Sequence, residues 1–163
     1  MRQTIDPGTR IGHVHLKVSD LERAVAFYRD VLGFTETTRL GRQAAFLSAG
    51  GYHHHIGLNT WESAGGTLPP RGTTGLYHFA ILLPSRRALA EVVQGLIEHD
   101  WPIGGAADHG VSEAVYLNDP DGNGIELYFD RPHEQWPQDN RGNLEMYTRP
   151  LDLQGLLAEL SRK

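Results

Sequence analysis

The chain has 163 residues, a formal net charge of −5, 39% apolar residues and 21% charged residues. This length is enough for one domain with a hydrophobic core, and the acidic balance argues against nucleic acid as a partner. The absence of cysteine excludes disulfides and thiolate metal sites, which leaves His, Asp, Glu and water as ligands for any metal. We find no signal-peptide pattern and no apolar run long enough to span a membrane, so we expect a cytoplasmic protein with no membrane partner.

The first structural unit is predicted over residues 12–33, GHVHLKVSDLERAVAFYRDVLG. Alternating apolar residues predict a strand at its start, and apolar residues at helical spacing follow. Ser19 and Glu22 have the spacing of a capping box, which predicts that the helix begins there. Three more strands are expected after this helix, at residues 35–40, 44–49 and 53–60.

The second unit repeats the first. After a linker at about 63–75 that is rich in Gly and Pro, residues 77–98 align with residues 12–33 without gaps, and His78 meets His13. A helix is again expected after the strand, with Pro84-Ser85 at its start. The strands expected after this helix are a Gly-rich run that ends near His109, then residues 114–118 and 124–130.

Neither unit alone has enough strands to bury both faces of a sheet, so the two are expected to pair. We predict an α+β fold in which two βαβββ modules form a curved, barrel-like mixed sheet around a central metal site, with the helices outside. The whole chain, 1–163, is predicted to be a single domain. Its parts are module one at about 11–62, the linker, module two at about 76–131 and a C-terminal extension at about 132–163, in which four leucines predict a short helix.

A metal site is indicated by residues that share a strand face. Alternate residues of a strand point the same way, so His13 lies with His15, and the repeat puts His78 on the equivalent face. Glu126 stands in an otherwise apolar strand, where a carboxylate needs a partner or a cation. We interpret His13, His78 and Glu126 as a metal site with two His ligands and one carboxylate ligand.

Gly57 aligns with Glu126 in the repeat, at the position where a symmetric site would have a fourth ligand. Glycine supplies none, so the predicted site has three protein ligands and keeps open positions, as catalysis requires. These ligand types suit Fe(II), Mn(II), Zn(II) or Ni(II).

Residues 108–129, DHGVSEAVYLNDPDGNGIELYF, contain His109, Tyr116, a Pro-x-Gly turn and Glu126 in that order. This order resembles the pattern of extradiol ring-cleaving dioxygenases. Residues from about 11 to 129 resemble the vicinal oxygen chelate superfamily, which also includes glyoxalase I, methylmalonyl-CoA epimerase, and fosfomycin and bleomycin resistance proteins. Two departures are that Ala107 is outside the residue types this pattern prefers, and that many extradiol enzymes have four modules.

The resemblance is greatest to catechol 2,3-dioxygenase-like proteins, through the stretch YHHHIGLNTW and the one just described. It implies an Fe(II) enzyme that acts on a small aromatic diol with dioxygen. It gives ligand roles to His13, His78 and Glu126, supporting roles to His109 and Tyr116, and a catalytic histidine to the triple-His run. We also expect a homodimer or a higher homo-oligomer.

Within the triple-His run we assign His55 as the acid–base residue, because strand parity places it on the face of Gly57. By the same parity, His54 is expected to point to the opposite face. Tyr116 either hydrogen-bonds substrate oxygens or is an ordinary strand aromatic. His15 either supports a ligand or forms part of the pocket wall.

Two other functions stay open. A glyoxalase- or epimerase-like metal enzyme is disfavoured by Gly57, since those enzymes usually have a further ligand there. A metal-free binding or resistance protein is disfavoured because all three ligand types are retained. The Asp-Pro-Asp-Gly segment at residues 119–122 is expected to be a hairpin turn whose carboxylates point to water, not a ligand set.

Overall fold

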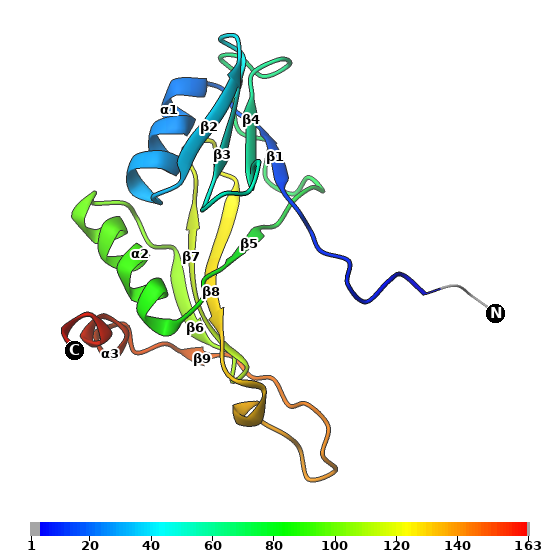
Figure 1. Ribbon diagram of the computed structural model, residues 1–163, viewed down its shortest axis with the longest axis vertical. Coiled ribbons are helices and arrows are strands. Elements are labelled where there is room, and N and C mark those ends of the chain that lie inside the picture. The colour runs from blue at the N-terminus through cyan, green and yellow to red at the C-terminus, as the bar shows by residue number, and fades with distance from the viewer. Residues whose placement is uncertain (1–3, 163) are drawn as a thin grey trace.

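The protein is described by a computed structural model that covers residues 4–162, and its main helices lie on one side of two separate sheets (Figure 1). The first sheet has the strand order β1-β4-β3-β2, and the second has the order β5-β8-β7-β6-β9. The predicted α+β class and the two βαβββ modules are confirmed. Over the described range the two curved sheets do not close into one barrel, because no strand of the first sheet pairs with a strand of the second.

Module one consists of β1 (Val14–Lys17), α1 (Leu21–Ala26) with a π-helical turn (Phe27–Val31), β2 (Thr35–Leu40), β3 (Ala44–Ser48) and β4 (Ile56–Asn59). Strand β4 runs parallel to β1 and antiparallel to β3. It is shorter than the strand predicted at 53–60, because the chain turns at Gly50 with φ +68° and rejoins β3 only at His55.

Module two consists of β5 (Phe79–Leu82), α2 (Arg86–Glu98), β6 (Gly105–Asp108), β7 (Ser112–Asn118) and β8 (Gly124–Asp130). Strand β5 runs parallel to β8, so this module repeats the topology of the first.

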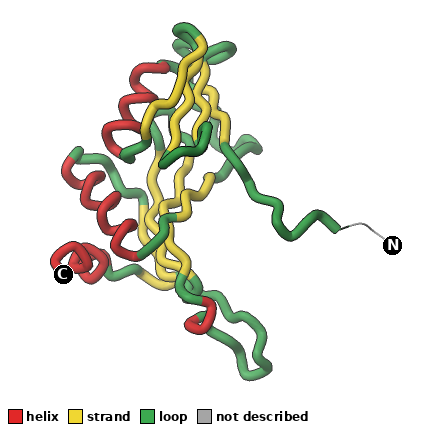
Figure 2. The backbone as a smooth tube through the Cα atoms, viewed as in Figure 1, coloured by secondary structure: helices red, strands yellow, loops and turns green. Residues whose placement is uncertain are grey.

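The C-terminal extension begins with a 3₁₀ turn (His133–Gln135) and a long loop that projects beyond the end of β8 (Figure 2). It then adds β9 (Arg149–Pro150) to the edge of β6 and ends in α3 (Leu153–Leu157) and a 3₁₀ turn (Ala158–Ser161). The predicted leucine-rich helix is therefore present, and it packs against α2 with Leu156 fully buried.

The two main helices begin at side-chain caps. Ser85 Oγ accepts a hydrogen bond from the Ala88 N–H at 3.1 Å, as the Pro84-Ser85 signal predicts. The cap of α1 is Asp20, which accepts from the Arg23 N–H at 3.1 Å, so the prediction that Ser19 caps this helix is wrong by one residue. Ser19 instead donates its hydroxyl to Asp121 in module two.

One apolar core joins the helices and both sheets. Leu16 and Leu58 in module one, and Ile125 and Leu127 in module two, are buried on the helix-facing side of their strands. Because side chains alternate along a strand, the opposite faces carry the polar candidates for the site.

The Asp119–Gly122 turn is a joint between the two modules. Asp119 is only 4% exposed and accepts hydrogen bonds from the Tyr28 hydroxyl at 2.9 Å and the Asn123 N–H at 2.8 Å. Asp121 accepts from Ser19 and from the Arg23 guanidinium at 2.8 Å. The expectation that these carboxylates point to water is wrong, because module one supplies donors that lie far away in the sequence.

Tyr28→Phe should lower the free energy of unfolding by about 1–3 kcal/mol, since Asp119 would stay buried with one donor fewer. Urea denaturation measures this, with Tyr77→Phe at a 90% exposed position as the control. Burial, followed by the charge of Asp119, raises the pKa of Tyr28. The stability that the Tyr28 hydroxyl contributes is fully present below the ordinary tyrosine pKa and is lost as the pH rises above it. The free energies of unfolding of Tyr28→Phe and the unmodified protein should therefore converge above about pH 10. Equal losses of unfolding free energy in Tyr28→Phe and Tyr77→Phe would show that the Tyr28–Asp119 hydrogen bond does not stabilise the contact between the modules.

Candidate active site

The sheet of module two carries a chain of four connected side chains. His78 Nε2 lies 3.1 Å from Glu126 Oε2, and the Tyr116 hydroxyl donates to Glu126 Oε1 at 2.9 Å. His109 Nε2 lies 2.7 Å from the Tyr116 oxygen. Strand pairing creates this arrangement, because Tyr116 on β7 is directly opposite Glu126 on β8 and His78 immediately precedes β5.

The hydrogen-bond partners of these four side chains indicate where their protons lie. Burial, and then the hydrogen bond to Glu126, raises the pKa of Tyr116 to about 12, so this hydroxyl stays protonated at neutral pH. A tyrosine has one proton to donate, and here it goes to Glu126. His109 must therefore carry a proton on Nε2 to bond the Tyr116 oxygen. The other ring nitrogen, Nδ1, lies 3.2 Å from both the Tyr147 carbonyl and the Thr148 hydroxyl.

The sheet of module one carries a cluster of imidazoles and aromatic rings. The ring centroids of His13 and His54 are 4.4 Å apart, and His15 lies against Phe46 at 5.8 Å and Trp61 at 5.6 Å. Burial, and then the charge of His13, lowers the pKa of His15. His15 is therefore neutral at neutral pH, and its role as a ligand support or a part of the pocket wall stays a prediction.

The His15 ring also covers Gly57. A Cβ atom added at position 57 would lie 3.0 Å from Cγ of His15, which is closer than ordinary contacts between side chains. A ligating side chain at this position would have to displace the imidazole.

The triple-His run lies in the connection before β4 and not in the strand, apart from the backbone of His55. The expectation that His54 points away from the site face is wrong, because its ring packs on His13 and on Phe46, at 5.0 Å. His55 Nδ1 accepts a hydrogen bond from the Ala49 N–H at 3.2 Å. A backbone N–H can only donate, so Nδ1 of His55 is the acceptor and the ring proton is on Nε2.

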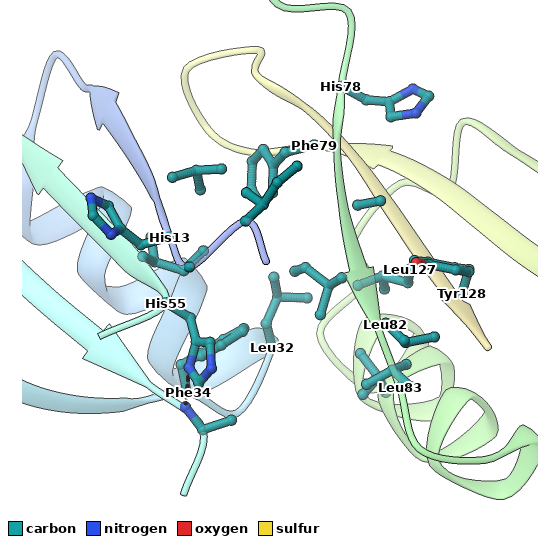
Figure 3. A pocket seen from close by; sticks show the side chains of 18 of the residues that line it. His13, Leu32, Phe34, His55, His78, Phe79, Leu82, Leu83, Leu127 and Tyr128 are labelled. Carbon is teal, nitrogen blue, oxygen red and sulfur yellow. Dashed lines mark hydrogen bonds between the residues drawn. The ribbon is translucent and has the colours of Figure 1, made fainter. Parts of the chain in front are cut away.

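A cavity of about 920 Å³ is lined by residues of both modules, among them His13, His55 and His78, but not by Glu126, Tyr116 or His109. Figure 3 shows His13 and His78 on opposite sides of this cavity, with rings that point away from each other. The structure thus joins His78 to Glu126 but does not bring His13 to them.

Part of this site has the donor chemistry that a metal ion needs. Within residues 4–162, no three His, Asp or Glu side chains are grouped closely enough to hold one. The donor types still suit Fe(II), and the imidazole nitrogen and carboxylate oxygen of His78 and Glu126 already converge. The chemistry of these two residues fits a metal ion, and the ligand roles of His13, His78 and Glu126 stay predictions.

Comparison with known proteins decides the family. Residues 10–127 match the sequence profile of the Glyoxalase/Bleomycin resistance protein/Dioxygenase superfamily. The chain belongs to this superfamily. This superfamily is also called the vicinal oxygen chelate superfamily. The resemblance seen in the sequence is thereby confirmed.

Two curated relatives are dioxygenases. The chain is 48% identical over 156 residues to catechol-2,3-dioxygenase of Bacillus subtilis (strain 168), which covers 96% of this chain and 54% of that protein. It is 33% identical to biphenyl-2,3-diol 1,2-dioxygenase 3 of Rhodococcus globerulus, which covers 78% of this chain and 65% of that protein. The chain therefore spans between half and two thirds of the length of these relatives.

A solved structure extends the likeness to the fold. The crystal structure of lactoylglutathione lyase from Agrobacterium tumefaciens matches with a TM-score of 0.59 and 26% identity, over 76% of this chain and 96% of that one. In the part of this chain that the structure describes, no helix has both the length and the apolar character needed to cross a membrane.

Proposed function

We propose that the protein is an Fe(II)-dependent extradiol ring-cleaving dioxygenase that acts on a small aromatic diol with dioxygen. The observation that carries this proposal is the continuous chain from His109 through Tyr116 and Glu126 to His78. Within this chain His109, Tyr116 and Glu126 follow the residue order of the extradiol pattern, and Glu126 lies beside His78, the other proposed ligand. The names of the two dioxygenase relatives support the same assignment.

His78 and Glu126 would hold the metal, and we propose His13 as the third ligand. Bound Fe(II) would supply the one-electron chemistry and the Lewis acidity that allow a diol to react with dioxygen. Tyr116 orients the Glu126 carboxylate through its hydrogen bond, and such supporting bonds typically change metal affinity about 10–100-fold.

His109 and Tyr116 act on charge that develops on the substrate. The His109 Nε2 proton goes to the Tyr116 oxygen, 2.7 Å away, and the Tyr116 proton goes to Glu126. Both groups would exchange these partners for substrate oxygens, where hydrogen-bond donors stabilise a developing oxyanion. We therefore assign them to the substrate oxygens, which extends the first of the two interpretations of Tyr116.

We assign the acid–base step to His54 in place of His55. The Nδ1 atoms of His53 and His54 are 2.7 Å apart, so one ring donates a hydrogen bond to the other, and the tautomer decides which one donates. When His54 Nδ1 holds the proton of this bond, its Nε2 presents a lone pair, and when His53 holds it, His54 Nε2 carries a proton. This alternation suits a base that later acts as an acid. His55 lacks it, because the Ala49 N–H keeps its Nδ1 unprotonated.

The proposal is tested by anaerobic reconstitution with Fe(II), followed by aerobic assay against a panel of catechols. Formation of the yellow ring-opened product is the expected result, and Mn(II), Zn(II) and Ni(II) serve as comparisons. A protein that binds Fe(II) stoichiometrically but opens none of these rings would refute the dioxygenase assignment.

A glyoxalase- or epimerase-like activity has less support, because the His15 ring occupies the space that a ligand at Gly57 would need. The homo-oligomer, the cytoplasmic location and the single-domain boundaries stay predictions.

A further inference from the structure

The turn that carries His109 is held by an arginine from another strand. Arg131 directly follows β8, and its Nη1 donates to Asp108 Oδ1 at 2.6 Å and to the Gly110 carbonyl at 2.9 Å. Its Nη2 donates to the second Asp108 oxygen at 3.0 Å. The residues on both sides of His109 are therefore fixed by one planar guanidinium group.

The turn has little freedom on its other side. Gly110 has φ +80°, and a Cβ atom there would lie 2.7 Å from Pro137 and 2.8 Å from the Tyr147 ring. Tyr147 and Thr148 contact His109 Nδ1 from the same direction. His109 is thus enclosed between Arg131 and the C-terminal extension, and its Nε2 is left pointing at Tyr116.

Arg131 has a structural twin in Arg86. Both guanidinium groups bind the buried carboxylate of Glu113 at 2.8 Å, and their side chains are 20% and 27% exposed. Beyond Glu113 their contacts differ, since Arg86 reaches the Gly155 carbonyl and Glu159 in the C-terminal helical segment. Arg131 instead reaches the turn that carries His109. Arg86 therefore supports the packing of the C-terminal segment, whereas Arg131 supports a turn of the candidate site.

We propose that Arg131 is a positioning residue that acts through Asp108 and Gly110 to aim His109 Nε2 at Tyr116. This inference rests on the proposed function, in which His109 and Tyr116 act on the substrate oxygens. A bidentate arginine–carboxylate pair fixes direction as well as distance, which a lysine in the same place does not. Displacement of a catalytic group by about 1 Å can cost roughly 10²-fold in rate.

The test compares Arg131→Met with Arg86→Met, because each removes one charge partner of Glu113. Both variants should lose stability to a similar degree in urea denaturation. Arg131→Met should lower kcat by about 10–10²-fold with KM changed by no more than a few-fold, while Arg86→Met keeps kcat. Arg131→Lys, which keeps the charge without the fork, should fall between Arg131→Met and the unmodified protein. Equal kcat losses in the two methionine variants would overturn the proposal.

A second measurement separates this inference from the proposed function. Long-range ¹H–¹⁵N NMR, with the His109 signals identified by their absence in His109→Gln, reports the hydrogen bond at Nε2 without any substrate. Arg131→Met and the milder Arg131→Lys should both shift the Nε2 signal, and Arg86→Met should leave it in place. If no diol is turned over but these shifts occur, the positioning role stands and the dioxygenase assignment fails. If the Nε2 signal is unchanged in both Arg131 variants, the positioning role fails whatever the activity.

Discussion

Glu126→Ala should remove metal binding and ring cleavage together. The Glu126 carboxylate lies 3.1 Å from His78 and accepts the Tyr116 hydroxyl, so its loss removes a proposed ligand together with the hydrogen bond that orients it. Removal of a supporting hydrogen bond typically lowers metal affinity about 10–100-fold. The loss of metal affinity in Glu126→Ala should be larger than this. Glu126→Asp keeps the charge on a shorter side chain and should weaken metal binding without abolishing it.

The measurement is metal content after anaerobic loading with Fe(II) and dialysis, with circular dichroism to verify the fold. Glu62→Ala is the matched control, because that carboxylate is 77% exposed and pairs only loosely with Lys17 at 3.6 Å. Glu62→Ala should keep full metal content. Metal content that is unchanged in Glu126→Ala would show that the metal site lies elsewhere.

The sequence predicts features that depend on strand period and on the repeat. Alternation along β8 separates Glu126 from the buried Ile125 and Leu127, and the repeat aligns His78, directly before β5, with His13. Parallel pairing of β5 and β8 then brings His78 and Glu126 together. These relations are local in the chain or follow from topology, so the amino-acid pattern alone is enough to find them.

The remaining differences arise where the period does not apply. His54 could not be placed by parity, because β4 begins at Ile56 and the preceding residues follow the turn at Gly50. The distance between His13 and His78 depends on how two separate sheets are oriented, and no hydrogen-bonded ladder sets that angle.

Contacts between distant parts of the chain were also missed. Asp119 accepts from Tyr28, and neither residue carries a local signal for the other. Tyr147 and Thr148 reach His109 from an irregular loop, where side-chain spacing predicts no direction. Carboxylates in a turn motif are therefore better treated as candidates for a buried contact than as solvent-facing by default.

His54→Ala should lower kcat by about 10²–10⁴-fold, the usual cost of losing general acid–base catalysis, while the metal and the fold are kept. The reason is its position, since the ring lies 4.4 Å from that of the proposed ligand His13 and is hydrogen-bonded to His53. His54→Gln keeps a hydrogen-bonding side chain of similar reach and should be almost as slow, because an amide does not take up a proton near neutral pH.

His55→Ala is the matched comparison, because it removes an imidazole from the next position in the same segment. His55 Nδ1 is bound by the Ala49 N–H, so the ring has no free lone pair with which to accept a proton. Its removal should cost stability through the lost contacts with Ala49 and Ser48 and should leave turnover within a few-fold. Single-turnover assays at matched metal content compare the two variants directly. If His55→Ala is the inactive variant and His54→Ala is active, strand parity predicts the catalytic side chain better than the ring contacts do. If neither variant slows ring opening, proton transfer does not use the triple-His run, and His109 becomes the remaining imidazole to test.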